Sequence, residues 1–461
     1  MSVRALLDAL DDAALASLGV ELHDLVRRLY PVPRSLTGDG VRETLRVLQE
    51  WLAGVATGPT TAAPLRVHEV PSGSQAFDWT VPKEWNVREA WIKDPAGRKI
   101  ADFAEHRLHL VGYSVPTRAR MPLAELQEHL HSLPDRPDLV PYRTSYYAES
   151  WGFCLPHAQR AALPDGEYEV LVDATLTDGA LSYGELELPG ASAGEEVLLS
   201  AHVCHPQLAN DNLSGLVVLA ALARALAVLT PEQRRYTYRF VFVPGTIGAI
   251  VWLARNPDCA RRVVHGLVAA NLGDPGPGAS AGAGGFHYKR SRRGNAAIDR
   301  AVQVAMCDLG EPLEVEDFVP FGYDERQYCS PGFDLPVGSL TRTPWGRYPE
   351  YHTSADDLDL VRPDALAGSV RAYLGVLAAL EGDRRYRNLQ PYGEPQLGRR
   401  GLYRTLGGDD RGRERELALL WVLNQSDGER GLLDIAEGSG VPMARLEEAA
   451  RALAEAGLLG S

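Results

Sequence analysis

Histidine, cysteine and carboxylate side chains gather in one short stretch of the chain and recur at later points. Residues 198–215, LLSAHVCHPQLANDNLSG, lead from a small hydrophobic run into a turn that ends in glycine. Further polar positions lie at 271–274 and 349–357. The side chains that could bind a metal are His202, Cys204, His205, Asp211, Asp274, His352 and Asp356. Hydrolytic zinc sites use imidazole nitrogens and carboxylate oxygens, and they keep one position open for water. These residue types therefore favour a metal site.

The elements that must position these residues alternate between strand and helix from about residue 195 onward. The apolar run 195–203 predicts a buried strand, 213–229 a helix, and 236–245 the next strand. Such alternation indicates an α/β domain with a mostly parallel sheet. Ligand sites in such sheets lie beyond the carboxyl ends of the strands, where these polar residues fall. Asp211 comes just before a predicted helix, whose amino-terminal end favours negative charge.

The rest of the chain predicts three further pieces. Helical periodicity over 5–30 and 41–52 predicts two helices near the start of the chain. We expect residues 1–64 and 192–388 to form one α/β domain, split by an insertion. Short alternating strands between turn residues predict a β-rich insertion over 65–191. Within it, 167–190 reads as a hairpin that turns at Asp178 and Gly179. Residues 389–461 show a winged-helix pattern.

Composition narrows the choice of partner. The 461 residues carry a formal net charge of −14, and the expected recognition helix, 443–459, has more glutamates than arginines. Phosphate binding needs a local excess of Lys and Arg, so we expect no nucleic-acid or membrane partner. The five cysteines are scattered without a C-x-x-C pair, which is typical of a reduced cytoplasmic protein. We also expect no signal peptide and no membrane span.

The polar stretches resemble the motifs of a known family. Residues 200–215 resemble the zinc aminopeptidase signature, in which an H-x-D element precedes A-x-D-N-x-S-G; 351–359 and NLGD at 271–274 resemble its last histidine and late aspartate. The whole chain is similar to a bacterial group of aminopeptidase-like proteins, through SLTGDGVRETL at 35–45 and DERQYCSPGFDLPVGSL at 324–340 among others. The resemblance implies a zinc-aminopeptidase fold with an inserted β domain, a winged helix, and one or two zinc ions. The implied metal ligands are His202, Asp211 as the bridging carboxylate, Asp274 and His352.

Two positions depart from the family pattern. Cys204 stands where the family has an aspartate that orients the first histidine, and His205 beside it could ligate instead. Gly245 stands where the related group keeps a glutamate, in PGTIG at 244–248. Loss of a general base costs roughly 10²–10⁴-fold in rate. Glu325 is the nearest candidate for a replacement catalytic carboxylate.

Plainer interpretations remain open for each residue. His202 and His205 could be core histidines, Cys204 a small buried residue, Asp274 a turn residue, and Asp324 with Glu325 part of a solvated loop. The leading hypothesis is a zinc-dependent aminopeptidase-like hydrolase that cleaves an amide bond next to a free amine. Its substrate would be a peptide or a small aminoacyl amide, and a homo-oligomer is possible. The alternative is a catalytically impaired scaffold that binds a peptide-like ligand or a protein partner.

Overall fold

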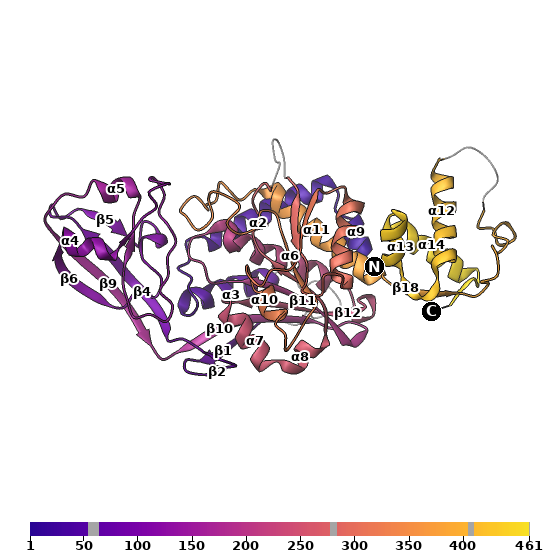
Figure 1. Cartoon of the computed structure of the whole chain (residues 1–461), viewed down its shortest axis with the longest axis horizontal. Coiled ribbons are helices and arrows are strands. Elements are labelled where there is room, and N and C mark those ends of the chain that lie inside the picture. Colours follow the sequence, from indigo (N-terminus) through magenta and orange to yellow (C-terminus); the bar gives the residue numbers. More distant parts are fainter. Residues whose placement is uncertain (54–63, 277–283, 404–409, 461) are drawn as a thin grey trace.

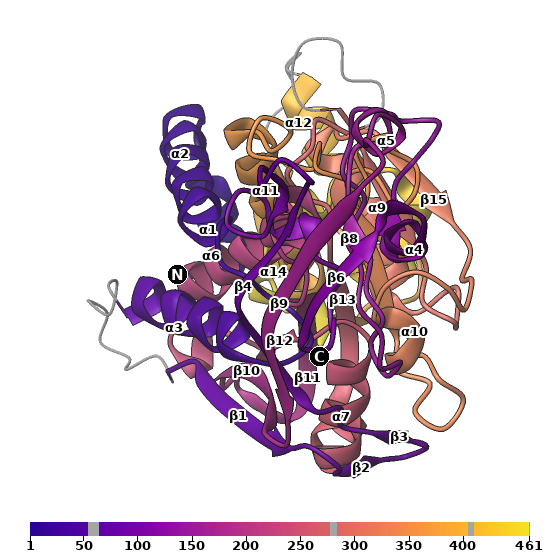
Figure 2. The same ribbon diagram turned by 90° about the vertical axis from the view of Figure 1, so that its left-hand side faces the viewer.

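The computed structural model describes residues 1–53, 64–276, 284–403 and 410–460. Figure 1 shows three parts in a row: a β-rich insertion, a central α/β domain and a small C-terminal domain. Figure 2 looks along this row, with the insertion nearest to the viewer. The predicted fold class is confirmed.

An eight-stranded sheet forms the centre of the molecule, in the order β1-β10-β12-β11-β13-β16-β14-β15. The pairs among β12, β11, β13 and β16 are parallel, as is β14 with β15, while β1, β10 and β14 pair antiparallel with neighbours. The strands are β1 (Arg66–Pro71), β10 (Ala180–Leu188), β11 (Ser192–His202), β12 (Tyr236–Val243), β13 (Val263–Ala269), β14 (Phe286–Lys289), β15 (Leu313–Glu316) and β16 (Val337–Thr341).

Helices cover both faces of this sheet, which explains the continuous apolar runs of its strands. Along β12, Phe240 and Phe242 belong to one core and Val241 and Val243 to the other, because successive side chains point to opposite faces. The first core includes residues of α2 (Asp12–Leu29), α3 (Asp39–Ala53), α6 (Gly215–Ala227), α9 (Ala297–Leu309) and α11 (Pro363–Gly382). The second includes residues of α7 (Ile247–Arg255), α8 (Pro257–Arg262) and α10 (Glu325–Tyr328). A short helix, α1 (Val3–Asp8), packs on α11.

The insertion has its own antiparallel sheet, in the order β5-β4-β9-β6. Its strands are β4 (Glu84–Lys93), β5 (Lys99–Asp102), β6 (Thr117–Pro122) and β9 (Glu167–Thr177). Smaller elements are β2 (Gln75–Ala76), β3 (Trp79–Thr80), β7 (Leu130–His131), β8 (Phe153–Cys154), α4 (Leu123–Leu126) and α5 (His157–Ala161).

The predicted hairpin over 167–190 is wrong. β9 pairs with β4 and β6, whereas β10 pairs with β1 and β12 in the central sheet. The reason is burial: β9 alternates between buried and partly exposed residues, while β10 is almost continuously buried and suits an interior position. The separate sheet therefore spans 84–177, and both ends of the predicted 65–191 insertion contribute strands to the central sheet.

The C-terminal domain contains α12 (Asp410–Gln425), α13 (Leu432–Ser439), α14 (Met443–Glu455) and a small sheet of β18 (Asp427–Gly431), β17 (Arg385–Asn388) and β19 (Leu459–Gly460). α14, the expected recognition helix, starts against the central domain: the Met443 N–H donates to the Asp308 carboxylate at 2.8 Å. Glu447 pairs with Arg4 at 3.0 Å, and Arg300 of α9 pairs with Asp434. The start of α14 thus packs against the central domain.

Among the described residues, no helix is long and apolar enough to cross a membrane.

Candidate metal centre

The carboxyl end of the parallel strands positions the first part of the site. His202 is the last residue of β11, opposite Val243 at the end of β12. Asp211 lies in the turn Ala209–Ser214 that leads into α6. Asp356, from a distant loop, holds this turn: its carboxylate accepts the N–H groups of Asn210 at 2.5 Å and Asp211 at 3.0 Å. The turn therefore has little freedom, and the Asp211 side chain is fixed.

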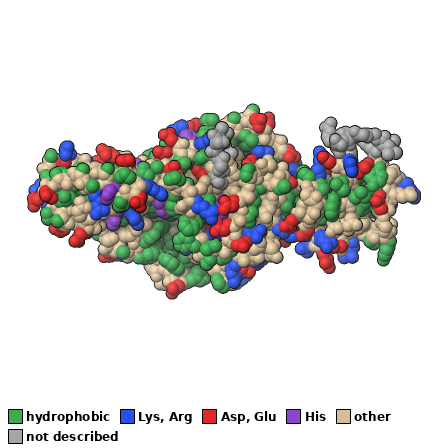
Figure 3. All heavy atoms as spheres, turned by 45° about the horizontal axis from the view of Figure 1, so that its top comes forward, with side chains coloured by type: hydrophobic (Ala, Val, Ile, Leu, Met, Phe, Trp, Pro, Cys, Tyr) green, Lys and Arg blue, Asp and Glu red, His purple; other side chains and the backbone are tan. Residues whose placement is uncertain are grey.

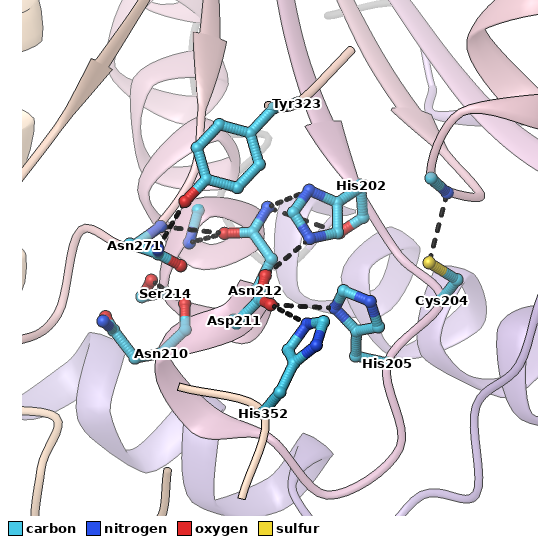
Figure 4. A network of polar contacts seen from close by, with 12 residues as sticks. His202, Cys204, His205, Asn210, Asp211, Asn212, Ser214, Asn271, Tyr323 and His352 are labelled. Carbon is cyan, nitrogen blue, oxygen red and sulfur yellow. Dashed lines mark hydrogen bonds and ion pairs between the residues drawn. The ribbon is translucent and has the colours of Figure 1, made fainter. Parts of the chain in front are cut away.

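Three imidazoles converge on the Asp211 carboxylate (Figure 4). His202 Nε2 lies 2.7 Å from Oδ1, while His205 Nδ1 and His352 Nε2 lie 3.3 and 3.0 Å from Oδ2. Ligand atoms of His202, His205 and Asp211 lie within 4.8 Å of one another. Asp211 has no exposed surface. The structure thus brings together four of the five metal ligands that the sequence suggested.

The charges in this cluster are strongly coupled. Burial acts to raise the pKa of Asp211, but the charges of His205 and His202 and the hydrogen bond with His202 outweigh it and hold the pKa well below its usual range. Burial acts to lower the pKa of His202, but Asp211 outweighs it and raises the pKa. Burial lowers the pKa of His205, which favours its neutral form. A neutral imidazole is the form that binds a metal.

The donor set fits a divalent metal such as zinc. His205 Nδ1 is buried and makes no hydrogen bond of normal geometry among the described residues, although Asp211 Oδ2 lies 3.3 Å away. A buried polar atom without such a bond is costly unless something else binds it. Three imidazole nitrogens and one carboxylate are ligands that zinc prefers.

Residues that the sequence analysis missed hold these histidines in place. The Asn212 amide nitrogen lies 3.3 Å from His202 Nδ1 and donates to the Ala269 carbonyl at 3.0 Å. The Tyr142 ring packs edge-on against both His205 and His352, and its N–H donates to the His352 carbonyl at 2.8 Å. Tyr142 belongs to the insertion, so the insertion contributes directly to the site. Nothing in the local spacing of Tyr142 could have indicated this contact.

Asp274 lies beside the cluster and bonds to other groups. Its carboxylate accepts the Asn210 side-chain amide at 3.0 Å, the Gly276 N–H at 3.0 Å and the Thr343 hydroxyl. Burial raises the pKa of Asp274. Through Asn210, this carboxylate supports the turn that carries Asp211.

The two departures from the family pattern are neighbours in space. Cys204 Sγ accepts the Gly245 N–H at 3.2 Å (Figure 4), and burial raises the pKa of this thiol to about 12. Cys204 is therefore a buried thiol and not a thiolate. A Cβ at Gly245 would lie 3.0 Å from Cys204 Sγ and 3.6 Å from His202 Cβ. Position 245 thus borders the candidate metal centre, and Cys204 takes part of the space that a side chain at position 245 would use.

Glu325, the expected catalytic carboxylate, is fully buried and forms an ion pair with Lys289 of β14. The preceding residue, Asp324, accepts the N–H of Thr246, which follows Gly245, at 2.7 Å. Neither residue lies in a solvated loop.

The chain is similar to known proteins along most of its length. A Clostridium acetobutylicum protein, whose name places it in polysaccharide biosynthesis with an aminopeptidase-like domain, is 45% identical over 96% of both chains. A crystal structure from the same organism, described as a candidate peptidase, is 43% identical over 97% of both chains, with a TM-score of 0.86. The Bacillus subtilis zinc aminopeptidase shares the fold at 12% identity, with a TM-score of 0.56 over 78% of this chain and 94% of that one. A peptidase M28 precursor from Shewanella amazonensis shares the fold at 16% identity, with a TM-score of 0.54 over 82% of this chain and 97% of that one.

These similarities confirm the resemblance to bacterial aminopeptidase-like proteins. Residues 23–383 match a family described as a domain of unknown function, DUF4910, and residues 384–461 match a winged helix-turn-helix family. The chain belongs to the DUF4910 family, with an aminopeptidase-like fold followed by a winged helix-turn-helix domain.

Proposed function

We propose that this protein is a zinc-dependent, aminopeptidase-like hydrolase that cleaves an amide bond next to a free amine. The observation that carries the proposal is the convergence of three imidazole nitrogens on the buried Asp211 carboxylate. His202, His205, Asp211 and His352 would hold one or two zinc ions. We also propose Asp274 as a ligand. Its carboxylate would first have to give up its hydrogen bonds to Asn210 and Thr343.

Zinc, when bound, polarises a carbonyl and lowers the pKa of a bound water. The protein's own part is to hold the ligands still. Asp356 fixes the turn that carries Asp211, and Tyr142 packs against two of the three histidines. Ligand orientation of this kind is worth roughly 10–100-fold in metal affinity or activity.

The substrate proposed is a peptide or a small aminoacyl amide. The name of the Clostridium acetobutylicum relative points to polysaccharide biosynthesis, so an aminoacyl group on the nitrogen of an amino sugar belongs among the amides to be tested. We propose a cytoplasmic location and no nucleic-acid or membrane partner. A homo-oligomer is compatible with this function. The packing of the start of α14 against the central domain supports a protein-contact role for the winged helix.

Metal content tests the proposal. We expect one or two zinc ions per chain, by inductively coupled plasma mass spectrometry on protein purified without chelator. Asp211→Asn and His352→Ala should lose the metal, because each removes a ligand from the cluster. Asp317→Asn is the matched control, since this carboxylate is 86% exposed and, within the described part of the chain, pairs only with Arg290. A wild-type chain that takes up no zinc even after incubation with it would rule the proposal out.

A second candidate function is a binding scaffold that has lost catalysis, and Gly245 is the observation that favours it. Position 245 borders His202, yet it offers no side chain. The scaffold would bind a peptide-like ligand or a protein partner. Assay of the zinc-loaded chain on a panel of aminoacyl amides separates the two functions: turnover that His352→Ala abolishes excludes the scaffold.

A further inference from the structure

A buried carboxylate lies next to the position where the related group has its glutamate. Asp324 is 2% exposed, and its Oδ1 accepts the Thr246 N–H at 2.7 Å. Thr246 directly follows Gly245, and a Cβ at Gly245 would lie 3.6 Å from His202 Cβ. Asp324, which arrives from the loop before α10, thus brings a carboxylate to the border of the metal centre that residue 245 itself does not provide.

The second oxygen of this carboxylate is free to act. Asp324 Oδ2 is buried and has no hydrogen-bond partner among the described residues. A buried carboxylate oxygen in this condition is costly, unless a proton or a ligand engages it. Oδ1 is fixed by Thr246, so Oδ2 is the atom that can exchange a proton.

The charges around Asp324 suit proton exchange near neutral pH. Burial and the charge of Glu325 raise the pKa of Asp324, while His202, the Thr246 N–H and Arg326 oppose them; the resulting pKa is about 6. In turn, the charge of Asp324 acts on His202 and on Cys204, so the carboxylate lies within electrostatic reach of the cluster. A general base works best when its pKa lies near the working pH.

Glu325 is less suited to this role. Its carboxylate pairs with Lys289, and the Lys289 ammonium also donates to the Phe321 carbonyl at 2.5 Å. The two neighbouring acids therefore differ in their partners: Glu325 is held against the Lys289 ammonium, whereas Asp324 bonds to the backbone beside position 245.

We propose that Asp324 is the general base of this site and supplies the carboxylate that is absent at Gly245. This inference rests on the proposed hydrolase function. As the water oxygen bonds to the amide carbonyl carbon, one water proton moves to Asp324 Oδ2. When the C–N bond breaks, its electron pair leaves with the nitrogen, and Asp324 returns the proton to that nitrogen. The carboxylate is restored, and water plus amide becomes acid plus amine.

Infrared difference spectroscopy tests this assignment without turnover. The probe is acetohydroxamic acid, a small acid that binds zinc and does not depend on the substrate side chain. It is added to the zinc-loaded wild type at neutral pH. We expect the proton that it loses to appear on Asp324, as a new protonated-carboxyl stretching band that shifts in D₂O. The band should be missing in Asp324→Asn and unchanged in the exposed control Asp317→Asn. A wild type without the band, or an Asp324→Asn protein that keeps it, overturns the proposal.

Zinc content and turnover separate this inference from the proposed function. Asp324→Asn should keep its zinc and lose roughly 10²–10⁴-fold in kcat, the usual cost of a lost general base. Asp324→Ala leaves room for a small carboxylate, so added formate should restore part of the turnover. A merely structural role predicts no rescue. Zinc-loaded Asp324→Asn protein with normal kcat overturns the base assignment alone, whereas a wild type without zinc overturns both proposals.

Discussion

Asp211 is the residue on which the site depends, because three imidazole nitrogens lie within 3.3 Å of its two oxygens. Its position is set from outside the motif that contains it, since the Asp356 carboxylate accepts the N–H groups of both Asn210 and Asp211. Asp356 is fully buried, and burial raises its pKa to about 8. Its role is therefore to support the turn that carries Asp211.

At the same scale, Gly245 and Cys204 should be changed together. A Cβ at Gly245 would approach Cys204 Sγ to 3.0 Å, so Gly245→Glu alone forces the thiol to move. Cys204→Ala removes that sulfur. We expect Gly245→Glu in the Cys204→Ala background to exceed Gly245→Glu alone in kcat/KM on aminoacyl amides, with Cys204→Ala as the control. Equal activity of the two Gly245→Glu proteins would contradict the packing argument.

At the scale of elements, one arginine joins three neighbouring strands of the central sheet. Arg239 of β12 bonds to Glu185 at 2.5 Å and Glu187 at 2.7 Å on β10, and to Glu196 at 2.6 Å on β11. Arg239 is 4% exposed. Because β10 follows the insertion in the chain, this network ties the end of the insertion to the central sheet.

Arg239→Met should destabilise the protein strongly. It removes the arginine from the Glu185 carboxylate and one of the two arginines from the Glu196 carboxylate, which keeps Arg262. Breaking a buried ion pair costs about 3–5 kcal/mol. The matched control is Arg88→Met: Arg88 also pairs with a carboxylate through two bonds, to Asp173, but its side chain is 73% exposed. Solvent screens an exposed pair of this kind, so its loss should cost far less than the loss of the buried network. Urea denaturation measures both, and equal losses would show that burial is not the deciding factor.

At the scale of the whole molecule, the three parts share contacts that bear on function. The insertion places Tyr142 against the histidines, and α14 starts against Asp308 of the central domain. On the face shown in Figure 3, acidic and basic side chains are interspersed, without a broad basic patch. This agrees with the net charge of −14 and gives no support to phosphate recognition on that face.

The pH dependence of folding provides a test at this scale. Burial, together with Arg235, lowers the pKa of His265 in β13 from 6.5 to about 3. Below pH 6.5 the unfolded chain binds a proton that the folded protein does not, so this contribution to stability is complete above pH 6.5 and falls as the pH drops toward 3. The slope is about 1.4 kcal/mol per pH unit at its steepest. His265→Gln should remove this slope in urea denaturation between pH 7 and pH 5; an unchanged slope would contradict the assignment.

Much of the protein was predictable from the sequence because its signals are local. The apolar strand runs, the helices between them and the polar residues at strand ends predicted the α/β fold and placed His202, His205, Asp211 and His352 as candidates. Only the tertiary structure decided which carboxylates join them. Asp274 bonds to Asn210 and Thr343, and Glu325 pairs with Lys289. Asp324 accepts the Thr246 N–H beside the candidate metal centre. Likewise, β10 pairs with β12 in the central sheet and not with β9 in the expected hairpin. The physical reason is common to these cases: spacing along the chain sets local structure, whereas the direction and partner of a side chain depend on segments that only folding brings together.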